Sequence, residues 1–538
     1  MEKLTIENFR SFKESAEIDL ARINIITGPN NSGKSNILKM LLLFDDYINS
    51  RNHFSFLFNG YNTGKHKIDS YQNAVNWSNW KSDKIIRFAI VVESNELKFE
   101  FIPGAEVAGR RRAGNEKEGR LYRFEFISSH GNKLSLEYKK GNEYLLTVDR
   151  FLINELWIKW DLPELEYRDL ASDLETRQAD QLKRISGMIK RVNEIDSGSP
   201  EYIKRIIRIA SYTNGYRLNQ AKLEKIKQEV KNEPKKQTIK TSVIVTPDGS
   251  GSMQLPELIS EGLRDYISED PSKNNMMLDG DTLKQELRNI NRIIKRYFKF
   301  RLAHLDPDRS DQSRIHLYSE KLTEINRLVH YQKARPFLKN SEADKFLMKW
   351  MRALNIGTSY RLVNLEGIAW AIEIKGRYGW RNIVDKGFGA GQIFSLLMRI
   401  AEVIERASLS LSIESRQLPF IVAIEEPEAN LHPKFQSVLA DIFMDAVGSA
   451  NVQFVIETHS EYFIRRFQYL VADKRKNLSS TDIKILYFRE SDPKQPGAEL
   501  VYDLGMRPDG ILKRDFGTGF FDEATKLTVD LLKQQKKN

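Results

Sequence analysis

The sequence of 538 residues contains no cysteine. Disulfide bonds and thiolate metal sites are therefore excluded, and we expect a protein of a reducing compartment, the cytoplasm. The sequence also lacks any run of about 18 consecutive apolar residues, the length that a membrane span requires, so we expect no membrane association. The first residues, Met1 to Ile6, have the pattern of a strand and lack the apolar core of a signal peptide.

The composition, 41% hydrophobic and 29% charged, is that of a globular protein with room for two or three domains. The formal net charge of +11 favours a polyanionic partner, so a nucleic acid is one open alternative. Basic runs in a sequence are more often solvated faces than binding sites. The positive charge of this chain is concentrated in two such runs: Arg110, Arg111, Arg112, Lys117 and Arg120, and then Lys222, Lys225, Lys227, Lys231, Lys235, Lys236 and Lys240.

A glycine-rich stretch near the N-terminus has the pattern G-x-x-x-x-G-K-S of a P-loop. The apolar run 23–26 before it predicts a buried strand, and residues 36–44 after it have apolar residues at helical spacing. Backbone N–H groups of such a loop, together with the helix N-terminus, form a cradle for phosphate oxygens. We expect Lys34 to reach the β- and γ-phosphates and the Ser35 hydroxyl to bind Mg²⁺. The residues expected to bind ATP here are Gly28, Asn30, Asn31, Ser32, Gly33, Lys34, Ser35 and Asn36.

The hydrophobic periodicity changes along the chain and divides it into four segments. Residues 1–150 combine the P-loop with strands of period two from about residue 84, which predicts an antiparallel meander. Residues 151–355 are charged and have helical spacing, including a short heptad-like stripe from Leu283 to Tyr297, which predicts an inserted helical arm. Strands return in residues 356–490, which we expect to form a second lobe. Residues 491–538 are expected to form a C-terminal module.

Two apolar runs in the second lobe end in polar residues. The run 419–424 is followed by Glu425 and Glu426, and the run 453–456 is followed by Glu457 and His459. Buried parallel strands read as continuous apolar runs, and ligands bind at their carboxyl ends. Adjacent carboxylates there are costly unless a cation or a reaction uses them. Upstream, Gln72 is a candidate metal or water ligand, with a surface glutamine as the alternative.

Four motifs in this order resemble the ABC-type ATPases of the SMC, RecF and OLD group: the P-loop, the glycine-rich turn 387–392, Ile424 to Pro433, and Glu457 to Ser460. The resemblance covers roughly residues 1–150 and 355–490. It implies an α/β fold, an ABC-type P-loop ATPase head with an antiparallel β subdomain and an inserted helical arm. Residues 509–511 and 519–523 are similar to a C-terminal module of antiphage-defence ATPases, such as PtuA of Septu and retron-associated relatives.

Roles follow from the matched motifs. The resemblance implies ATP and Mg²⁺ as cofactors, Glu425 as a metal ligand, and two catalytic residues, Glu426 as the general base and His459 as the contact to the γ-phosphate. The signature loop caps the ATP of another subunit in this group, which implies a homodimer or a higher even oligomer. Glycine stands where relatives have a serine hydroxyl in this loop, so we expect slow turnover. The residues of this chain that match the signature loop are Gly389, Gly391 and Gln392.

Three functions remain open. In the first, the ATPase is the sensor or regulatory subunit of an antiphage complex and controls a separate nuclease or toxin, plausibly of HNH type. No acidic cluster typical of a nuclease follows His459, so the effector is expected on another chain. In the second, a RecF- or SMC-like dimer clamps duplex DNA during repair. In the third, the protein is an ATP-dependent scaffold with little turnover.

Overall fold

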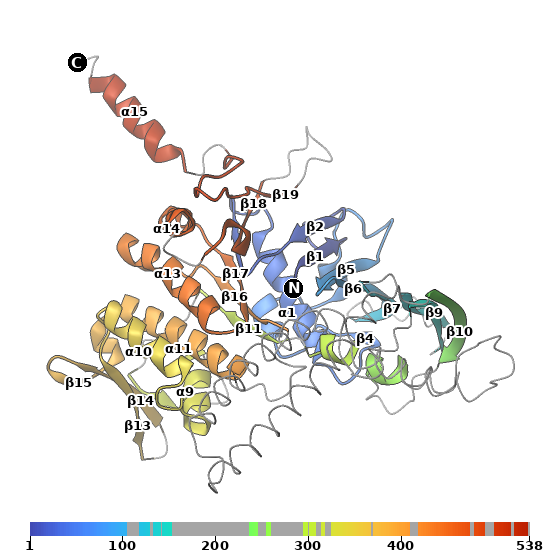
Figure 1. Cartoon of the computed structure of the whole chain (residues 1–538), viewed down its shortest axis with the longest axis horizontal. Helices are drawn as coiled ribbons and strands as arrows, with labels where there is room; N and C mark the ends of the chain where they lie inside the picture. Colours follow the sequence, from blue (N-terminus) through green and yellow to red (C-terminus); the bar gives the residue numbers. More distant parts are fainter. Residues whose placement is uncertain are drawn as a thin grey trace, which may run out of the picture.

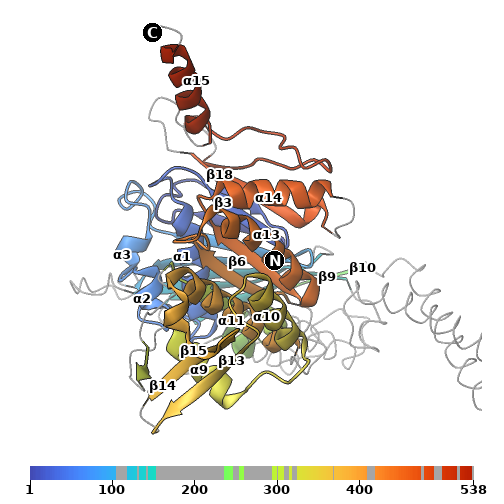
Figure 2. The ribbon, with the colours of Figure 1, turned by 90° about the vertical axis from the view of Figure 1, so that its left-hand side faces the viewer.

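In the described part of the chain, the structure, a computed structural model, contains three β-sheets and the helices that cover them (Figure 1; Figure 2). It describes residues 1–104, 118–129, 133–140, 143–152, 236–245, 254–259, 294–299, 301–307, 314–317, 324–366, 369–408, 418–473, 478–489, 500–517 and 521–535. Most of the range expected to form a helical arm, with most of the heptad-like stripe and of the two basic runs, lies outside these residues.

The central sheet contains the P-loop strand and has the order β11-β16-β17-β3-β18-β19. All neighbours are parallel except β18 and β19. Its three middle strands are almost entirely buried, which explains why they read as continuous apolar runs. The strands are β3 (Ile23–Thr27), β11 (Leu302–Leu305), β16 (Phe420–Glu425), β17 (Val452–Glu457), β18 (Ile483–Phe488) and β19 (Val501–Asp503).

The central sheet separates two hydrophobic cores. In β16, Ile421 and Ala423 belong to the core shared with α1 (Lys34–Ile48), whereas Phe420, Val422 and Ile424 belong to the core on the other face. Successive side chains of a strand point to opposite faces, so one apolar strand supplies both cores. The second core also holds the buried faces of α10 (Glu342–Ala353), α11 (Phe388–Ser408), α13 (Pro433–Ser449) and α14 (Glu461–Ala472).

An antiparallel sheet covers the other side of α1. Its order is β10-β9-β8-β7-β6-β5-β1-β2, with β4 paired to β7. The ring of Phe44 in α1 packs edge-on against Phe88 with centroids 4.7 Å apart, and Phe88 stacks on Phe99 at 5.0 Å. The strands are β1 (Lys3–Glu7), β2 (Ala16–Asp19), β4 (Ser55–Phe56), β5 (Ile86–Val92), β6 (Asn95–Pro103), β7 (Gly119–Ile127), β8 (Lys133–Lys140), β9 (Glu143–Leu152) and β10 (Lys236–Val245).

A small third sheet lies beside α9 (Glu324–Ala334) and α10, and its order is β12-β14-β13, with β15 paired to β14. Its strands are β12 (His316–Leu317), β13 (Ser359–Leu365), β14 (Ala369–Gly376) and β15 (Gly379–Asn382). Short helices α2 (Thr63–His66) and α3 (Tyr71–Ala74) follow α1, and two 3₁₀ turns span Ile383–Lys386 and Ser480–Asp482. Figure 1 shows the last helix, α15 (Glu523–Gln535), projecting away from the sheets.

The predicted fold class is confirmed: a mixed α/β fold in which the sheet that carries the P-loop is joined to an antiparallel β subdomain. The domain boundaries stay predictions. Within residues 151–355, where the sequence indicates a helical arm, the structure has strands β10, β11 and β12, and β11 belongs to the central sheet. In the described part of the chain, no helix combines the length and the apolarity that crossing a membrane requires.

Candidate nucleotide-binding site

The P-loop connects the end of β3 to the start of α1, and both of its glycines are required by the backbone. Gly28 has φ +141°, and a Cβ atom there would lie 2.2 Å from the carbonyl oxygen of Phe488. Gly33 has φ +96°, and its Cβ would lie 2.3 Å from Ser11 Oγ. Residues that carry a side chain rarely adopt such φ values, and neither position has room for a Cβ atom. The structure therefore gives a local reason for both glycines of the motif.

Lys34 folds back over the loop that precedes it. Its Nζ donates hydrogen bonds to the carbonyl oxygens of Gly28, at 3.1 Å, and Pro29, at 2.6 Å. Burial lowers the pKa of the ammonium group, and the charges of Glu457 and Glu426 raise it in part. The lysine is thus held beside the loop and within electrostatic reach of two carboxylates that come from the distant half of the sequence.

Carboxylates from two neighbouring strands meet beside Ser35. Glu425 and Glu457 are register partners at the ends of β16 and β17, and Ser35 Oγ donates to Glu457 Oε1 at 3.1 Å. Burial raises the pKa of Glu457 to about 7, with a further contribution from the charge of Glu425. The other carboxylate oxygen of Glu457, Oε2, is buried and has no hydrogen-bond partner among the described residues.

This donor set fits Mg²⁺. A hydroxyl and carboxylate oxygens are the ligands that Mg²⁺ takes from proteins, usually with one or two carboxylates and with phosphates completing the sphere. The partnerless oxygen of Glu457 is the kind of group that a cation would satisfy, because a buried polar atom without a partner is costly. Ser35, Glu425 and Glu457 are therefore the residues that would hold the ion.

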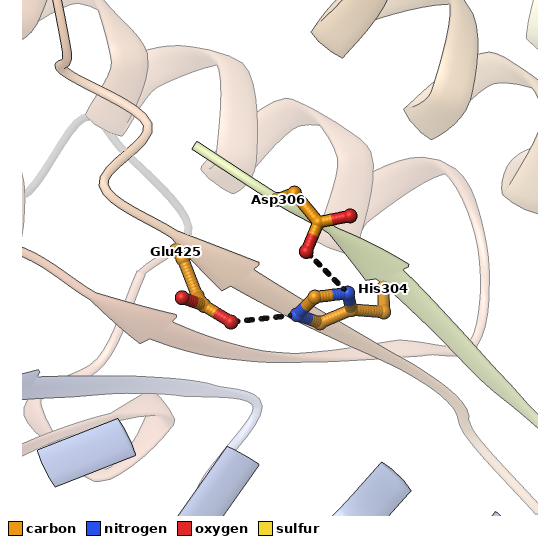
Figure 3. A group of neighbouring side chains, drawn as sticks. All are labelled: His304, Asp306 and Glu425. Carbon is orange, nitrogen blue, oxygen red and sulfur yellow. Dashed lines mark hydrogen bonds and ion pairs between the residues drawn. The ribbon is translucent and has the colours of Figure 1, made fainter. Parts of the chain in front are cut away.

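A histidine that the sequence analysis did not single out supports Glu425 from the edge strand β11. Figure 3 shows the imidazole of His304 between two carboxylates: Nε2 lies 2.9 Å from Glu425 Oε1, and Nδ1 lies 3.4 Å from Asp306 Oδ1. One donor atom from each of the three lies within 4.8 Å of the others. The two ring nitrogens face different carboxylates, so we interpret His304 as a buried support for Glu425 rather than as a metal ligand.

The residues after the two strands are also brought together. Glu426 has φ +43°, outside the usual range for a side-chain-bearing residue, and its N–H donates to the carbonyl oxygen of Glu457 at 2.8 Å. Glu428 Oε1 accepts from the N–H of His459 at 2.7 Å. Burial lowers the pKa of His459, and the charge of Lys34 lowers it further, whereas the charge of Glu426 raises it. His459, Glu426 and Lys34 thus lie in one electrostatic neighbourhood.

The signature turn lies at the start of α11. A Cβ on Gly389 would lie 3.6 Å from Leu431 Cδ2 and 3.7 Å from the carbonyl oxygen of Asn430, so this turn packs on the segment that follows Glu428. Gln392 is buried, whereas Gly391 is half-buried. No hydrogen bond between this turn and the P-loop is found among the described residues. The described contacts of the turn are therefore with the segment that follows the carboxylates of β16.

The other predicted residues are distributed as follows. Ser32 Oγ donates to the carbonyl oxygen of Pro29 at 2.8 Å, within the loop. Asn36 Nδ2 donates to Ser11 Oγ at 2.8 Å, which joins the start of α1 to the segment between β1 and β2. Asn30 and Asn31 are exposed on the loop. Gln72 is exposed on α3, and its role as a metal ligand stays a prediction.

Comparison with known proteins identifies a family. The family model described as AAA ATPase domain matches residues 1–464. Over 98 residues the chain is 32% identical to the uncharacterized protein MJECL10 of Methanocaldococcus jannaschii, a match that takes in 18% of this chain and 39% of that protein. The chain therefore spans about two fifths of the length of the curated relative that it matches.

Solved structures give weaker likenesses. The Smc head domain of Pyrococcus furiosus, bound to the C-terminal domain of ScpA, is 13% identical with a TM-score of 0.33 and coverage of 98% of both chains. The SMC head domain of Thermotoga maritima is 10% identical with a TM-score of 0.31, covering 94% of this chain and 98% of that one.

Proposed function

This chain belongs to the AAA ATPase domain family, and from that premise we propose that it binds ATP with Mg²⁺ and hydrolyses the bond between its β- and γ-phosphates at the P-loop site. One observation carries the proposal. The hydroxyl of Ser35, in the P-loop, bonds to Glu457, which lies 422 residues further along the chain. Glu457 is in turn paired in register with Glu425 on the neighbouring strand. Phosphate-binding and metal-binding groups thus share one end of one sheet.

Each residue has a distinct part in the proposed reaction. Lys34 would exchange its loop carbonyls for phosphate oxygens, which are stronger acceptors for an ammonium group. When bound, Mg²⁺ would offset the negative charge of the phosphates. Glu426 would take the proton of the attacking water, and its unusual backbone conformation, fixed by the Glu457 carbonyl, directs it from the strand end. His459 would donate a hydrogen bond to the γ-phosphate.

We propose that the working form is a homodimer or a higher even oligomer. The signature turn at the start of α11 packs on residues 430–431 of its own chain and makes no described hydrogen bond to its own P-loop. Gly389, Gly391 and Gln392 would then cap the ATP of a second copy. Without a hydroxyl in this turn, backbone N–H groups alone would contact the phosphate, which supports slow turnover.

The substitution Glu426→Gln tests both proposals. It removes the base but keeps the size of the side chain, so we expect hydrolysis to fall by about 10²- to 10⁴-fold while ATP binding persists. In sedimentation with ATP and Mg²⁺, the variant should accumulate as a dimer or larger even assembly. Glu461→Gln, an exposed change on α14, is the matched control and should behave as wild type. Undiminished hydrolysis would refute the assigned base, and a monomer with bound ATP would refute the assembly.

We further propose that the ATPase is a cytoplasmic regulatory subunit of an antiphage-defence complex and controls a separate nuclease or toxin. The C-terminal turn that supports this resemblance packs against the helix that follows His459. Gly510 has φ +79°, a Cβ there would lie 2.2 Å from the Gln468 carbonyl oxygen, and Gln468 Nε2 donates to the Gly510 carbonyl at 2.9 Å. A change at His459 would thus reach a module that a partner could bind.

Two alternatives predict different results. A RecF- or SMC-like DNA clamp is favoured by the net charge of +11 and predicts ATP-stimulated duplex binding that weakens steeply with salt. An ATP-dependent scaffold predicts that wild type and Glu426→Gln form the same complex at the same rate. The regulatory role predicts co-purification with the product of the neighbouring gene, an HNH-type nuclease being the expected chemistry. Failure of that co-purification, with DNA binding intact, would favour the clamp.

A further inference from the structure

A cavity of about 400 Å³ lies beside the ATP site, behind β11. Its wall is built by α1, residues 61–65, the start of β11, α9 and α11, which belong to distant parts of the sequence. The volume falls in the range of pockets that hold small molecules or cofactors. Nothing in the proposed hydrolysis of ATP uses this space.

Cationic side chains dominate the lining of this cavity. Lys65 and the arginines at 301, 327, 399 and 406 line it, against two carboxylates, Asp45 and Glu402. Glu402 is already engaged, because it accepts hydrogen bonds from both Arg399 and Arg406. Asp45 accepts from Asn62, and burial raises its pKa to about 6. The lining therefore contains more basic than acidic side chains.

Two of the arginines contact the same aromatic ring. The guanidinium groups of Arg301 and Arg406 both lie over the ring of Phe420, at 5.1 and 5.0 Å from its centroid. Burial lowers the pKa of Arg301, and the charge of Arg406 lowers it further. Guanidinium groups are well suited to binding phosphate, because their N–H groups match its oxygens in pairs.

Tyrosines add two further features. The hydroxyl of Tyr331 is buried and has no hydrogen-bond partner among the described residues, although burial raises its pKa and keeps it a donor. Lys65 Nζ and the Arg327 guanidinium lie 5.8 and 5.2 Å from the centroid of the Tyr61 ring, and Tyr61 is 70% exposed. An unused donor and an accessible ring are what a phosphorylated molecule with a flat ring system would engage.

We propose that this basic cavity binds a small phosphorylated molecule of nucleotide size, separate from the ATP in the P-loop. The phosphates lie against Arg301 and Arg406 and accept from Tyr331, and Tyr61 packs on the remainder of the ligand. His304 lines the cavity and also contacts Glu425, so the two sites share one side chain. Binding in the cavity does not depend on ATP hydrolysis, and the proposed ATPase activity can fail without affecting it.

The test is calorimetric titration of the full chain carrying Lys34→Ala, which weakens the P-loop site, with pyrophosphate and with ADP as probes. One saturable site per chain is expected for both. Adding Arg301→Gln should weaken binding at least tenfold. Adding Tyr331→Phe, which removes only a hydroxyl, should weaken it about fivefold, the usual value of one hydrogen bond. Adding Tyr61→Ala should weaken binding of ADP more than of pyrophosphate.

A matched control distinguishes the cavity from general charge. Arg361→Gln removes an exposed arginine that bonds to Glu373 on the third sheet, and it should leave both affinities unchanged. The proposal is overturned if the Lys34→Ala chain binds neither probe at millimolar concentration. It is also overturned if Tyr331→Phe and Arg301→Gln bind like their parent, or if Arg361→Gln loses as much affinity as Arg301→Gln. Circular dichroism confirms that each variant is folded.

Discussion

Replacing Glu457 with glutamine should stabilise the ligand-free protein at alkaline pH. Burial raises the pKa of this carboxyl from its usual 4.5 to about 7 in the folded state. Because the pKa of Glu457 is higher in the folded state, the contribution of this group to stability is fully present below about pH 4.5 and is lost as the pH rises through 7. The shift corresponds to about 3 kcal/mol of the free energy of unfolding. The glutamine side chain of the Glu457→Gln variant cannot ionise and still accepts from Ser35, so that loss should disappear.

The assay is urea unfolding of wild type and Glu457→Gln without nucleotide or metal, followed by tryptophan fluorescence at several pH values. At pH 8 the variant should be more stable by about 3 kcal/mol, and near pH 5 the difference should shrink to below about 1 kcal/mol. Glu461→Gln, which alters an exposed carboxylate paired with Arg465, should stay within about 0.5 kcal/mol of wild type throughout. A variant that is no more stable at pH 8, or a difference that does not change with pH, would refute the reasoning.

The same substitution should have the opposite effect once ligand is present. Mg²⁺ and ATP stabilise the fold by an amount that increases with their affinity for it. Because Glu457→Gln replaces a charged oxygen donor with a neutral one, Mg²⁺ with ATP should stabilise the variant less than the wild type. Comparing melting temperatures with and without ligand at pH 8 measures this. An equal gain in both proteins would show that Glu457 does not contact the ion.

Two further predictions concern backbone and core. Gly28→Ala should lower the affinity for ATP and destabilise the fold by at least about 1 kcal/mol, because its Cβ would meet the Phe488 carbonyl. Gly64→Ala is the control, because its Cβ meets nothing within 4 Å, and it should change neither the affinity in binding assays nor the stability in unfolding assays. Phe443→Ala should cost about 3–5 kcal/mol in urea unfolding because the ring is fully buried, whereas Tyr462→Ala, 55% exposed, should cost under about 0.5 kcal/mol. Equal effects within either pair would contradict these assignments.

The sequence predicted the elements that carry local signals. The P-loop is legible because its glycines, lysine and serine are contiguous, and the structure places them between β3 and α1 as expected. The apolar runs before Glu425 and Glu457 predicted buried parallel strands, and both lie next to each other in the central sheet. The antiparallel meander was predicted from period-two alternation, and β5 to β9 pair in sequence order. Continuous motifs and strict periodicity are sufficient in these cases.

The residues that escaped prediction depend on pairing between distant segments. β11 has only four residues, Leu302–Leu305, and lies in a stretch dominated by helical spacing, so nothing local marks it as a strand of the ATPase sheet. Its parallel pairing with β16 sets His304 opposite Ala423 and brings its ring to Glu425. A histidine flanked by apolar residues reads as a core residue in isolation.

Glu457 was visible in the sequence as a strand-end carboxylate, but its role was not. Its importance follows from the fact that β17 is inserted between β3 and β16, so that its last residue is aligned with both Ile26 and Glu425. That strand order places one buried carboxyl between the P-loop serine and the second acid, and it produces the raised pKa. Strand order is a property of the whole sheet, which makes Glu457 a consequence of topology: a permuted order with the same motifs would leave Ser35 without this partner.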